Sequence, residues 1–179
     1  INRDDQDLFA LNSQQKAFSS SQKGRFASEI VPVAIPQKKG DPIIFKTDEF
    51  IKGNSTIEIL QKLKPAFREN GTVTAGNASG INDGAAALLI ASDAAVSEYN
   101  LKPIARFVSS AVAGVEPKFM GIGPVTAARM ALKKAGLSFN DLSVIELNEA
   151  FAAQGLACIR EWGLKDDDNR INPNGGASA

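Results

Sequence analysis

The chain has 179 residues, 44% of them hydrophobic, and its 20 basic side chains balance 20 acidic ones. That length can bury a sizeable core in one or two domains, while the neutral balance gives no support for nucleic acid or an anionic membrane surface as a partner. No apolar run approaches the roughly 20 residues that span a bilayer. The sequence contains no histidine, which excludes Ser-His or Cys-His catalysis and histidine metal sites from these residues.

The N-terminal third predicts a helix, a hairpin and a second helix. Residues 4–19 are predicted to form a helix capped by Asn2, with an apolar face made by Leu8, Leu11, Gln15 and Phe18. Residues 28–35 and 43–46 are expected to form two strands around the polar turn 38–42. Ser55 or Thr56 should cap the second helix, which Pro65 ends.

The stretch 71–92, GTVTAGNASGINDGAAALLIAS, is the most distinctive part of the sequence. Residues 72–74 are β-prone, and the six residues that follow, 75–80, carry no large side chain. Residues 82–84 predict a tight turn, and the apolar run 85–91 predicts a strand buried on both faces. A loop of tiny residues lets another backbone or a flat ligand approach closely, although close packing alone would also explain it.

Two further elements are expected before residue 136. Ser92 should cap a helix over residues 93–99, and the alternating residues 104–109 predict a strand. Pro124 suits the start of a helix that runs over 125–135. The glycines before it are not a dinucleotide-binding fingerprint, because Thr126 stands where the third glycine would be.

Near the C-terminus the chain predicts a strand-to-helix corner. Residues 143–147 read as a strand, and residues 148–151 turn it into a helix that runs to about Trp162. An α/β sheet places ligand chemistry at such corners, beside free helix N–H groups. The carboxylate run 166–168 could bind a metal only within a shaped loop, so a solvated turn is expected and no metal site is assigned.

Several long strings in this order resemble the thiolase family: QDLFALNSQQKA, GRFASEIVPV, LKPAF, TVTAGNASGINDGAAA, MGIGPV, ELNEAFAAQ and NPNGGA. Thiolases make or break a carbon–carbon bond between acyl groups carried on coenzyme A. The resemblance covers essentially the whole chain. It implies an α/β thiolase-like fold with a layered α-β-α-β-α core. Residues 1–80 would be a partial loop domain, 81–102 the end of the N-terminal core domain, and 103–179 a truncated C-terminal core domain.

The resemblance also implies roles for individual residues. Asn148 matches the asparagine that orients a water in the oxyanion hole, although a helix cap would also explain it. The coenzyme A contact loop would include Ala75, Ser79 and Gly80, and Lys52 matches a basic position near the nucleotide end, with a solvated surface lysine as the alternative. Met120 would lie against the pantetheine arm. Ala150 and Phe151 would line the acyl and pantetheine channel, and Glu149 is expected to have a structural or supporting role.

The family's covalent chemistry needs groups that these residues lack. Thiolases use a nucleophilic cysteine, a histidine in a Gly-His-Pro motif and a second cysteine in a glycine-rich motif. Cys158, the single cysteine, lacks the small-residue surroundings of the nucleophile and is expected to be a buried apolar residue. A lone cysteine forms no internal disulfide, which favours a reducing, cytoplasmic compartment. We expect the chain to be a central-to-C-terminal part of a longer protein.

The function implied by the resemblance is acyl transfer, first of all condensation of two acetyl-CoA to acetoacetyl-CoA or the reverse thiolysis. One alternative is a longer-chain 3-ketoacyl-CoA thiolase of fatty-acid degradation, and another is a non-catalytic coenzyme A-binding fragment. A coenzyme A thioester is the expected substrate, with no permanently bound cofactor and with a homodimer or homotetramer as the assembly. The chain alone is expected to be inactive.

Overall fold

The computed structural model describes residues 1–179, which form two compact units. The first unit comprises Ile1–Gly80 and Leu142–Ala179, and the second comprises Ile81–Asp141. Residues 142–179 thus pack with residues 1–80, while the predicted division into 1–80, 81–102 and 103–179 stays a prediction. None of the helices is both long and apolar enough to cross a lipid bilayer.

Helix α1, Arg3–Gln22, is the longest element of the first unit, and Asn2 caps it as predicted. The Asn2 Oδ1 accepts a hydrogen bond from Asp5 N at 2.8 Å. The predicted apolar face is wrong, because Leu8 and Phe18 are 53% and 42% exposed. Of the predicted face only Leu11 is buried, and the other buried residues of the helix are small or polar, namely Gln6, Asp7, Ala10, Ser13, Gln14, Ala17 and Ser20. A face of this kind admits close backbone contact, provided that its polar groups find hydrogen-bond partners.

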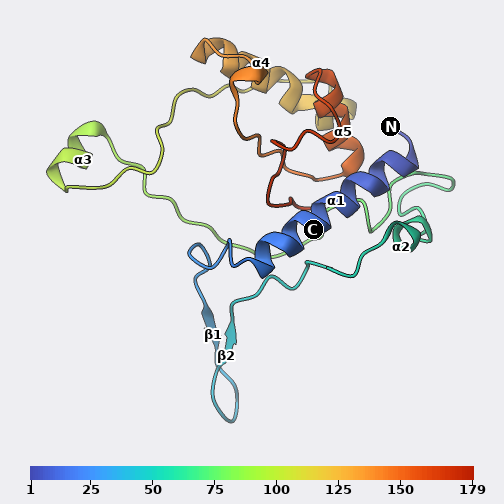
Figure 1. Ribbon diagram of the computed structural model, residues 1–179, viewed down its shortest axis with the longest axis horizontal. Coiled ribbons are helices and arrows are strands. Elements are labelled where there is room, and N and C mark those ends of the chain that lie inside the picture. Colours follow the sequence, from blue (N-terminus) through green and yellow to red (C-terminus); the bar gives the residue numbers. More distant parts are fainter. The chain divides into compact units, whose positions relative to one another are not determined.

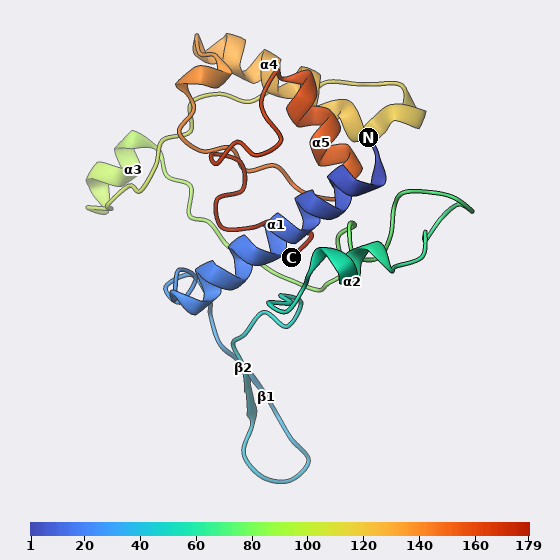
Figure 2. The same ribbon diagram turned by 45° about the vertical axis from the view of Figure 1, so that its right-hand side comes forward.

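Two elements pack along α1, and both views show them beside it (Figures 1 and 2). Helix α2, Ile57–Gln61, is capped by Thr56, and its Leu60 is buried against Ala10 and Leu11 of α1. Helix α5, Ala152–Glu161, contributes the buried apolar residues Ala152, Leu156, Cys158 and Ile159. Helix α1 thus contacts both α2 and α5, the helix that follows the corner 148–151.

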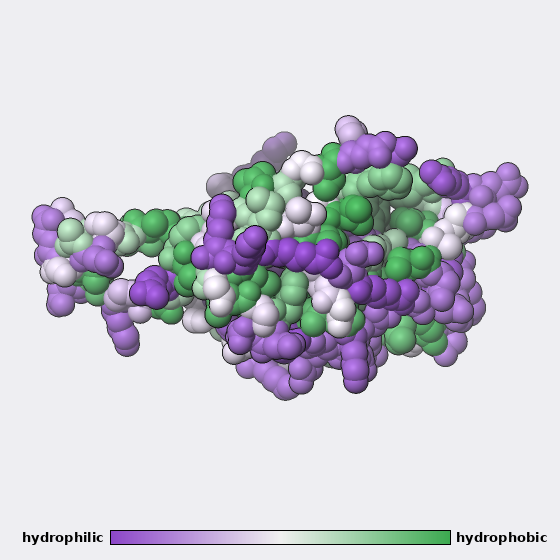
Figure 3. All heavy atoms as spheres, turned by 90° about the horizontal axis from the view of Figure 1, so that it is seen from above, coloured by the Kyte–Doolittle hydropathy of each residue, from purple (hydrophilic) through white to green (hydrophobic).

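The hairpin was predicted correctly but is shorter than expected. Strand β1, Val33–Ile35, pairs antiparallel with β2, Ile43–Phe45, and Gly40 in the connecting turn has a φ of 84°. Figure 1 shows the hairpin extending away from the helices of its unit. All six of its strand residues are exposed. The face of the molecule seen in Figure 3 likewise shows apolar side chains among hydrophilic ones.

In the second unit, helical elements are joined by long segments without regular secondary structure. It contains α3, Asp93–Glu98, then the 3-10 helix η1, Pro117–Ile122, then α4, Gly123–Ala135, and the 3-10 turn η2, Phe139–Asp141. The predicted cap of α3 is confirmed, because the Ser92 hydroxyl accepts from Ala95 N, and Gly136 ends α4 in the left-handed region at φ 70°. Ser109 Oγ donates to Ala131 O at 2.8 Å and joins the preceding segment to α4.

Two predicted strands are wrong, and a third is reduced to one bridge. Residues 85–91 and 104–109 form neither helix nor strand, and Leu88, Leu89 and Ile90 are 82–83% exposed. An apolar run suited to the centre of a sheet needs hydrogen-bonded neighbours, and no described segment pairs with either run. The predicted strand 143–147 keeps a single parallel bridge, between Ile145 and Ile171.

Candidate functional site

The small-residue loop 75–80 and the corner 148–151 lie against each other in the first unit. Ser79 N donates to Ala150 O at 3.0 Å, and Ser79 Oγ donates to the same oxygen at 3.2 Å. Ala152 N donates to Asn77 O at 2.9 Å, and Ala78 forms an antiparallel bridge with Phe151. Two segments that the sequence predicted to share one site, some 70 residues apart, are therefore joined through their main chains.

Asn148 projects from this corner into solvent. Leu147 and Glu149 on either side of it are buried at 7% and 2% exposure, whereas Asn148 is exposed and its side-chain amide has no protein hydrogen-bond partner. It does not cap α5, whose N-cap is Phe151 without a side-chain hydrogen bond. The helix-cap explanation of Asn148 is thus wrong, and an amide that is free to bind a water or ligand remains.

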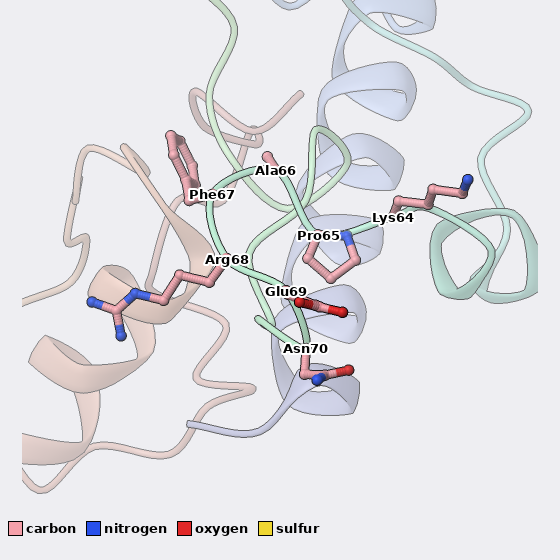
Figure 4. A pocket seen from close by; sticks show the side chains of 7 residues that line it. All are labelled: Lys64, Pro65, Ala66, Phe67, Arg68, Glu69 and Asn70. Carbon is pink, nitrogen blue, oxygen red and sulfur yellow. The ribbon is translucent and has the colours of Figure 1, made fainter.

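An aromatic pair stands beside the corner. The rings of Phe67 and Phe151 are 6.0 Å apart between centroids at 76°, an edge-to-face arrangement. Phe67 belongs to the segment that lines an open hollow of about 520 Å³, and Figure 4 shows its ring and the Lys64 side chain pointing away from each other. Sequence reasoning missed Phe67, although an aromatic residue in the polar string KPAFREN was a usable signal.

A buried polar cluster fixes the loop from behind. Asn77 Nδ2 donates to Asp7 Oδ1 at 2.8 Å, and Asn77 Oδ1 accepts from Thr74 N at 2.8 Å. Asp7, with no exposed surface, also pairs with Arg3 Nε at 2.7 Å. Arg3 Nη2 in turn donates to the carbonyl oxygens of Leu60 and Leu63 at 2.7 and 3.1 Å. Helix α1 thereby holds both α2 and the turn that leads into the small-residue loop.

A second buried cluster lies beneath the corner and centres on Glu149. Its Oε2 accepts from Ser13 Oγ at 2.6 Å and from Ser178 N at 3.1 Å, and its Oε1 accepts from Asn172 Nδ2 at 2.7 Å. Ser13 Oγ also accepts from Gly176 N at 2.9 Å. Glu149, for which a supporting role was expected, thus has partners on α1 and on the C-terminal segment 172–179. No local pattern in the sequence indicated these partners.

Of the other predicted contact residues, Lys52 makes separate contacts within the first unit. Lys52 N donates to Gln14 Oε1 at 2.6 Å, and the exposed Lys52 ammonium lies 5.1 Å from the centre of the Phe50 ring. Met120 belongs to the second compact unit and is 78% exposed. Ala75 and Gly80 lie at the two ends of the small-residue loop. The junction thus contains Ser79, Ala150 and Phe151, with Asn148 next to it, and the roles assigned to all these residues stay predictions.

Cys158 and the carboxylate run take no part in the junction. Burial raises the pKa of the Cys158 thiol, although a hydrogen bond from Gln154 opposes the shift. A thiol held neutral in this way is a poor nucleophile, and the prediction of a buried apolar residue is confirmed. Asp166 and Asp168 pair with Arg160 and Arg170, each at 2.6 Å.

The comparisons with known proteins agree with the arrangement of these segments. The family profile described as "Thiolase, N-terminal domain" matches residues 1–94, and "Thiolase, C-terminal domain" matches residues 101–179. Among curated relatives, a beta-ketoadipyl-CoA thiolase of Acinetobacter baylyi is 56% identical over 179 residues. An acetyl-CoA acetyltransferase of Pseudomonas aeruginosa is 55% identical over the same length. In each case all of this chain and 45% of the relative are covered, so the chain spans about half the length of these relatives.

Solved structures give the same fold. Human mitochondrial 3-ketoacyl-CoA thiolase matches with a TM-score of 0.93 at 46% identity, covering 100% of this chain and 44% of that one. The acetyl-CoA acetyltransferase of Bacillus anthracis matches with a TM-score of 0.95 at 44% identity, covering 99% and 44%. A structure of the human enzyme in complex with CoA matches with a TM-score of 0.92 at 46% identity, covering 100% and 43%. The predicted thiolase-like α/β fold is confirmed for the part of the fold that this chain spans.

Proposed function

The chain belongs to the thiolase family, and from that premise we propose that the full-length gene product transfers acyl groups between a cysteine thioester and coenzyme A. The proposed reaction is condensation of two acetyl-CoA to acetoacetyl-CoA, or the reverse thiolysis. The observation that carries the proposal is the main-chain junction between Ser79 and Ala150, because it joins the proposed coenzyme A loop to the corner that presents Asn148.

Carbon–carbon bond cleavage by thiolysis puts specific demands on a site. A thiolate attacks the 3-keto carbonyl, the bond between C2 and C3 breaks, and the departing acetyl-CoA carries the electron pair as an enolate whose charge rests on the thioester oxygen. A proton donor then protonates C2 of the enolate. Stabilising the thioester oxygen in the enolate is the contribution that this chain's residues can supply.

Asn148 is the proposed donor group. Its exposed amide, free of protein partners, would hydrogen-bond to a water and hold it in a fixed orientation. The water would then donate to the thioester oxygen. Lys52 would contact a phosphate of coenzyme A, and Met120 would lie along the pantetheine arm. The Phe67–Phe151 pair would supply apolar surface near the acyl group.

The nucleophilic cysteine, the histidine and the second cysteine of the family would come from the rest of a longer gene product. The 179-residue chain tested alone is therefore expected to show no condensation of acetyl-CoA. A non-catalytic coenzyme A-binding protein is the alternative, which the intact mass of the native protein and its turnover would distinguish. A cytoplasmic location and a homodimer or homotetramer are parts of the same proposal, to be checked by fractionation and light scattering.

A second acyl substrate is favoured by one observation. The relatives with 56% identity carry the name beta-ketoadipyl-CoA thiolase, against 55% for an acetyl-CoA acetyltransferase. A 3-oxo acyl group that ends in a carboxylate is therefore the second candidate, ahead of a long apolar 3-ketoacyl chain.

The test is a thiolysis assay on the full-length gene product with acetoacetyl-CoA, 3-oxoadipyl-CoA and a long-chain 3-ketoacyl-CoA. We expect turnover of acetoacetyl-CoA, and a loss of about 100-fold in kcat for Asn148→Ala, the size typical of a removed oxyanion donor. The matched control is Asn169→Ala, at an exposed asparagine of the same unit. Turnover with none of the three substrates would overturn the proposal, and a preference for 3-oxoadipyl-CoA would select the second candidate.

A further inference from the structure

Glu149 is a buried carboxylate without a cationic partner. It is 2% exposed, it forms no ion pair, and its two oxygens accept from three neutral donors. The donors come from α1, through Ser13, and from the C-terminal segment, through Asn172 and Ser178. A buried charge is costly unless hydrogen bonds satisfy it. The three donors therefore compensate for the burial of the Glu149 carboxylate and hold it in one position.

The cluster admits only a group that accepts on both oxygens. Asn172 Nδ2 faces Oε1, while Ser178 N and the Ser13 hydroxyl face Oε2. The Ser13 hydroxyl cannot turn freely, because its oxygen already accepts from Gly176 N. A glutamine at position 149 would therefore place its NH2 group against another donor in either orientation, although its size is almost the same.

Asn148 lies next to this cluster in the chain, between two buried side chains. Side chains at the corner alternate between inside and outside, with Leu147 buried, Asn148 exposed and Glu149 buried. In an extended segment this alternation means that fixing one side chain inward fixes its neighbour outward. Glu149 lies directly between Asn148 and Ala150, whose carbonyl oxygen receives both hydrogen bonds from Ser79.

We propose that Glu149 is a positioning residue that acts through Asn148. Its carboxylate ties the corner to α1 and to the C-terminal segment, and this fixes where the Asn148 amide stands relative to the small-residue loop. The inference rests on the proposed function in so far as Asn148 takes part in turnover. Its geometric content, that Glu149 sets the position of Asn148, is independent of the substrate.

A double-mutant cycle in the full-length gene product tests the catalytic part. We expect Glu149→Gln to lower kcat by about 10- to 100-fold, as a misplacement near 1 Å does, with KM for the acyl-CoA nearly unchanged. In an Asn148→Ala background the same change should lower kcat by less than about 2-fold, because its effect passes through the missing amide. Any change that Glu149→Gln makes in the thermal midpoint should, in contrast, be the same in the Asn148→Ala background. Equal losses of kcat in both backgrounds, or none in either, would overturn the proposal.

Two further variants guard against loss of folding and against a general effect of charge. Ser13→Ala removes one donor to the carboxylate, and with it the acceptor of Gly176 N, but keeps the carboxylate and its other two donors, so it should give a smaller loss of kcat with the same dependence on Asn148. Asp167→Asn removes an exposed carboxylate that lines the same cavity as Glu149 and should leave kcat unchanged. A loss for Asp167→Asn equal to that for Glu149→Gln would attribute the effect to charge alone and contradict positioning.

Crystal structures of the wild type and of Glu149→Gln, or of Ser13→Ala if the former does not fold, supply a measurement that needs no turnover. We expect the Asn148 side chain to move by about 1 Å or more relative to the small-residue loop, the scale that matters for a positioned group. An unmoved Asn148 would overturn the positioning role. A wild type that turns over none of the substrates would overturn the proposed function, while the structures would still decide the role of Glu149.

Discussion

The side chain of Asn172 takes the place of a strand neighbour for Leu147. Its Oδ1 accepts from Leu147 N at 2.7 Å, and its Nδ2 donates to Leu147 O at 2.8 Å. Two residues before Leu147, the Ile145 carbonyl oxygen accepts from the main-chain N of Asn172 at 2.9 Å, so main-chain pairing passes into pairing by a side chain. The remaining Nδ2 hydrogen reaches Glu149, which leaves every polar group of the amide satisfied.

Asn172→Asp should be strongly destabilising despite its nearly identical shape. The change removes both donors, leaves Leu147 O unpaired and puts a second carboxylate beside buried Glu149. We expect a loss of about 3–5 kcal/mol in the free energy of unfolding of the full-length gene product, measured with denaturant. Asn169→Asp, at an exposed asparagine, is the control and should change it by less than about 0.5 kcal/mol. Equal effects of the two variants would contradict the pairing.

Gly176→Ala tests how tightly the C-terminal segment packs on the cluster. A Cβ at this position would lie 2.4 Å from Glu149 Cδ and 2.8 Å from Asn172 Nδ2, so buried groups would have to move. We expect a loss of about 1–3 kcal/mol in calorimetric unfolding. Gly84→Ala meets nothing within 4 Å and should be neutral or slightly stabilising. A neutral Gly176→Ala would show that the segment lies farther from Glu149.

Asp7→Asn addresses the support behind the small-residue loop. The amide would lose the pairing with Arg3 and would present an NH2 group to at least one of the donors on Arg3 and Asn77. Because Asp7 is fully buried, we expect a loss of about 3 kcal/mol in the free energy of unfolding. Asp4→Asn, exposed on the first turn of the same helix, should lose less than about 1 kcal/mol. The comparison is made by denaturant unfolding of both variants.

The Asp168–Arg170 pair should make stability depend on pH in acid. Hydrogen bonds from the Arg170 side chain and backbone lower the pKa of the Asp168 carboxyl from 3.8 to about 2. A lowered pKa in the folded state stabilises above the unfolded value, and that stabilisation is lost as pH falls through the folded value. Asp168→Asn should therefore lower the thermal midpoint at pH 7, with a difference from wild type that shrinks between pH 4 and pH 2. A difference constant over this range would contradict the pair.

Lys52→Ala tests the proposed phosphate contact. The exposed ammonium would act as a point charge, so its loss should raise KM for coenzyme A by about 3- to 10-fold and leave kcat nearly unchanged. The rise should become smaller at high ionic strength, because screening weakens an exposed charge pair. Lys62→Ala, at an exposed lysine of the same unit, is the control in the steady-state assay. A change in kcat without a change in KM would assign Lys52 another role.

Local signals in the sequence predicted the helices well, because caps and breakers act over a few residues. Asn2, Ser92 and Gly136 stand where their helices begin or end. The apolar run 85–91 and the alternating stretch 104–109 failed as strand predictions for the opposite reason, since a strand exists only through pairing with another segment. The buried face of α1 was missed because its polar residues are satisfied by distant partners.

In the candidate site, too, the features set by local sequence were predicted and those set by distant contacts were not. The loop 75–80 and the corner 148–151 were found from their own residue types and from the family resemblance. The partners of Glu149 lie at positions 13, 172 and 178, and no spacing rule links them. A glutamate that continues the alternation of the buried positions Ile145 and Leu147 was the one available hint, and its partners were revealed only by the folded chain.

The contact between the small-residue loop and the corner is made mainly by peptide groups, with Ser79 Oγ as the one side-chain contribution. Attachment of this kind hardly depends on which side chains the two segments carry. Substitutions of the Ala150 and Phe151 side chains are therefore expected to leave these main-chain hydrogen bonds in place, so that the proposed acyl contacts could change while the loop and the corner stay joined.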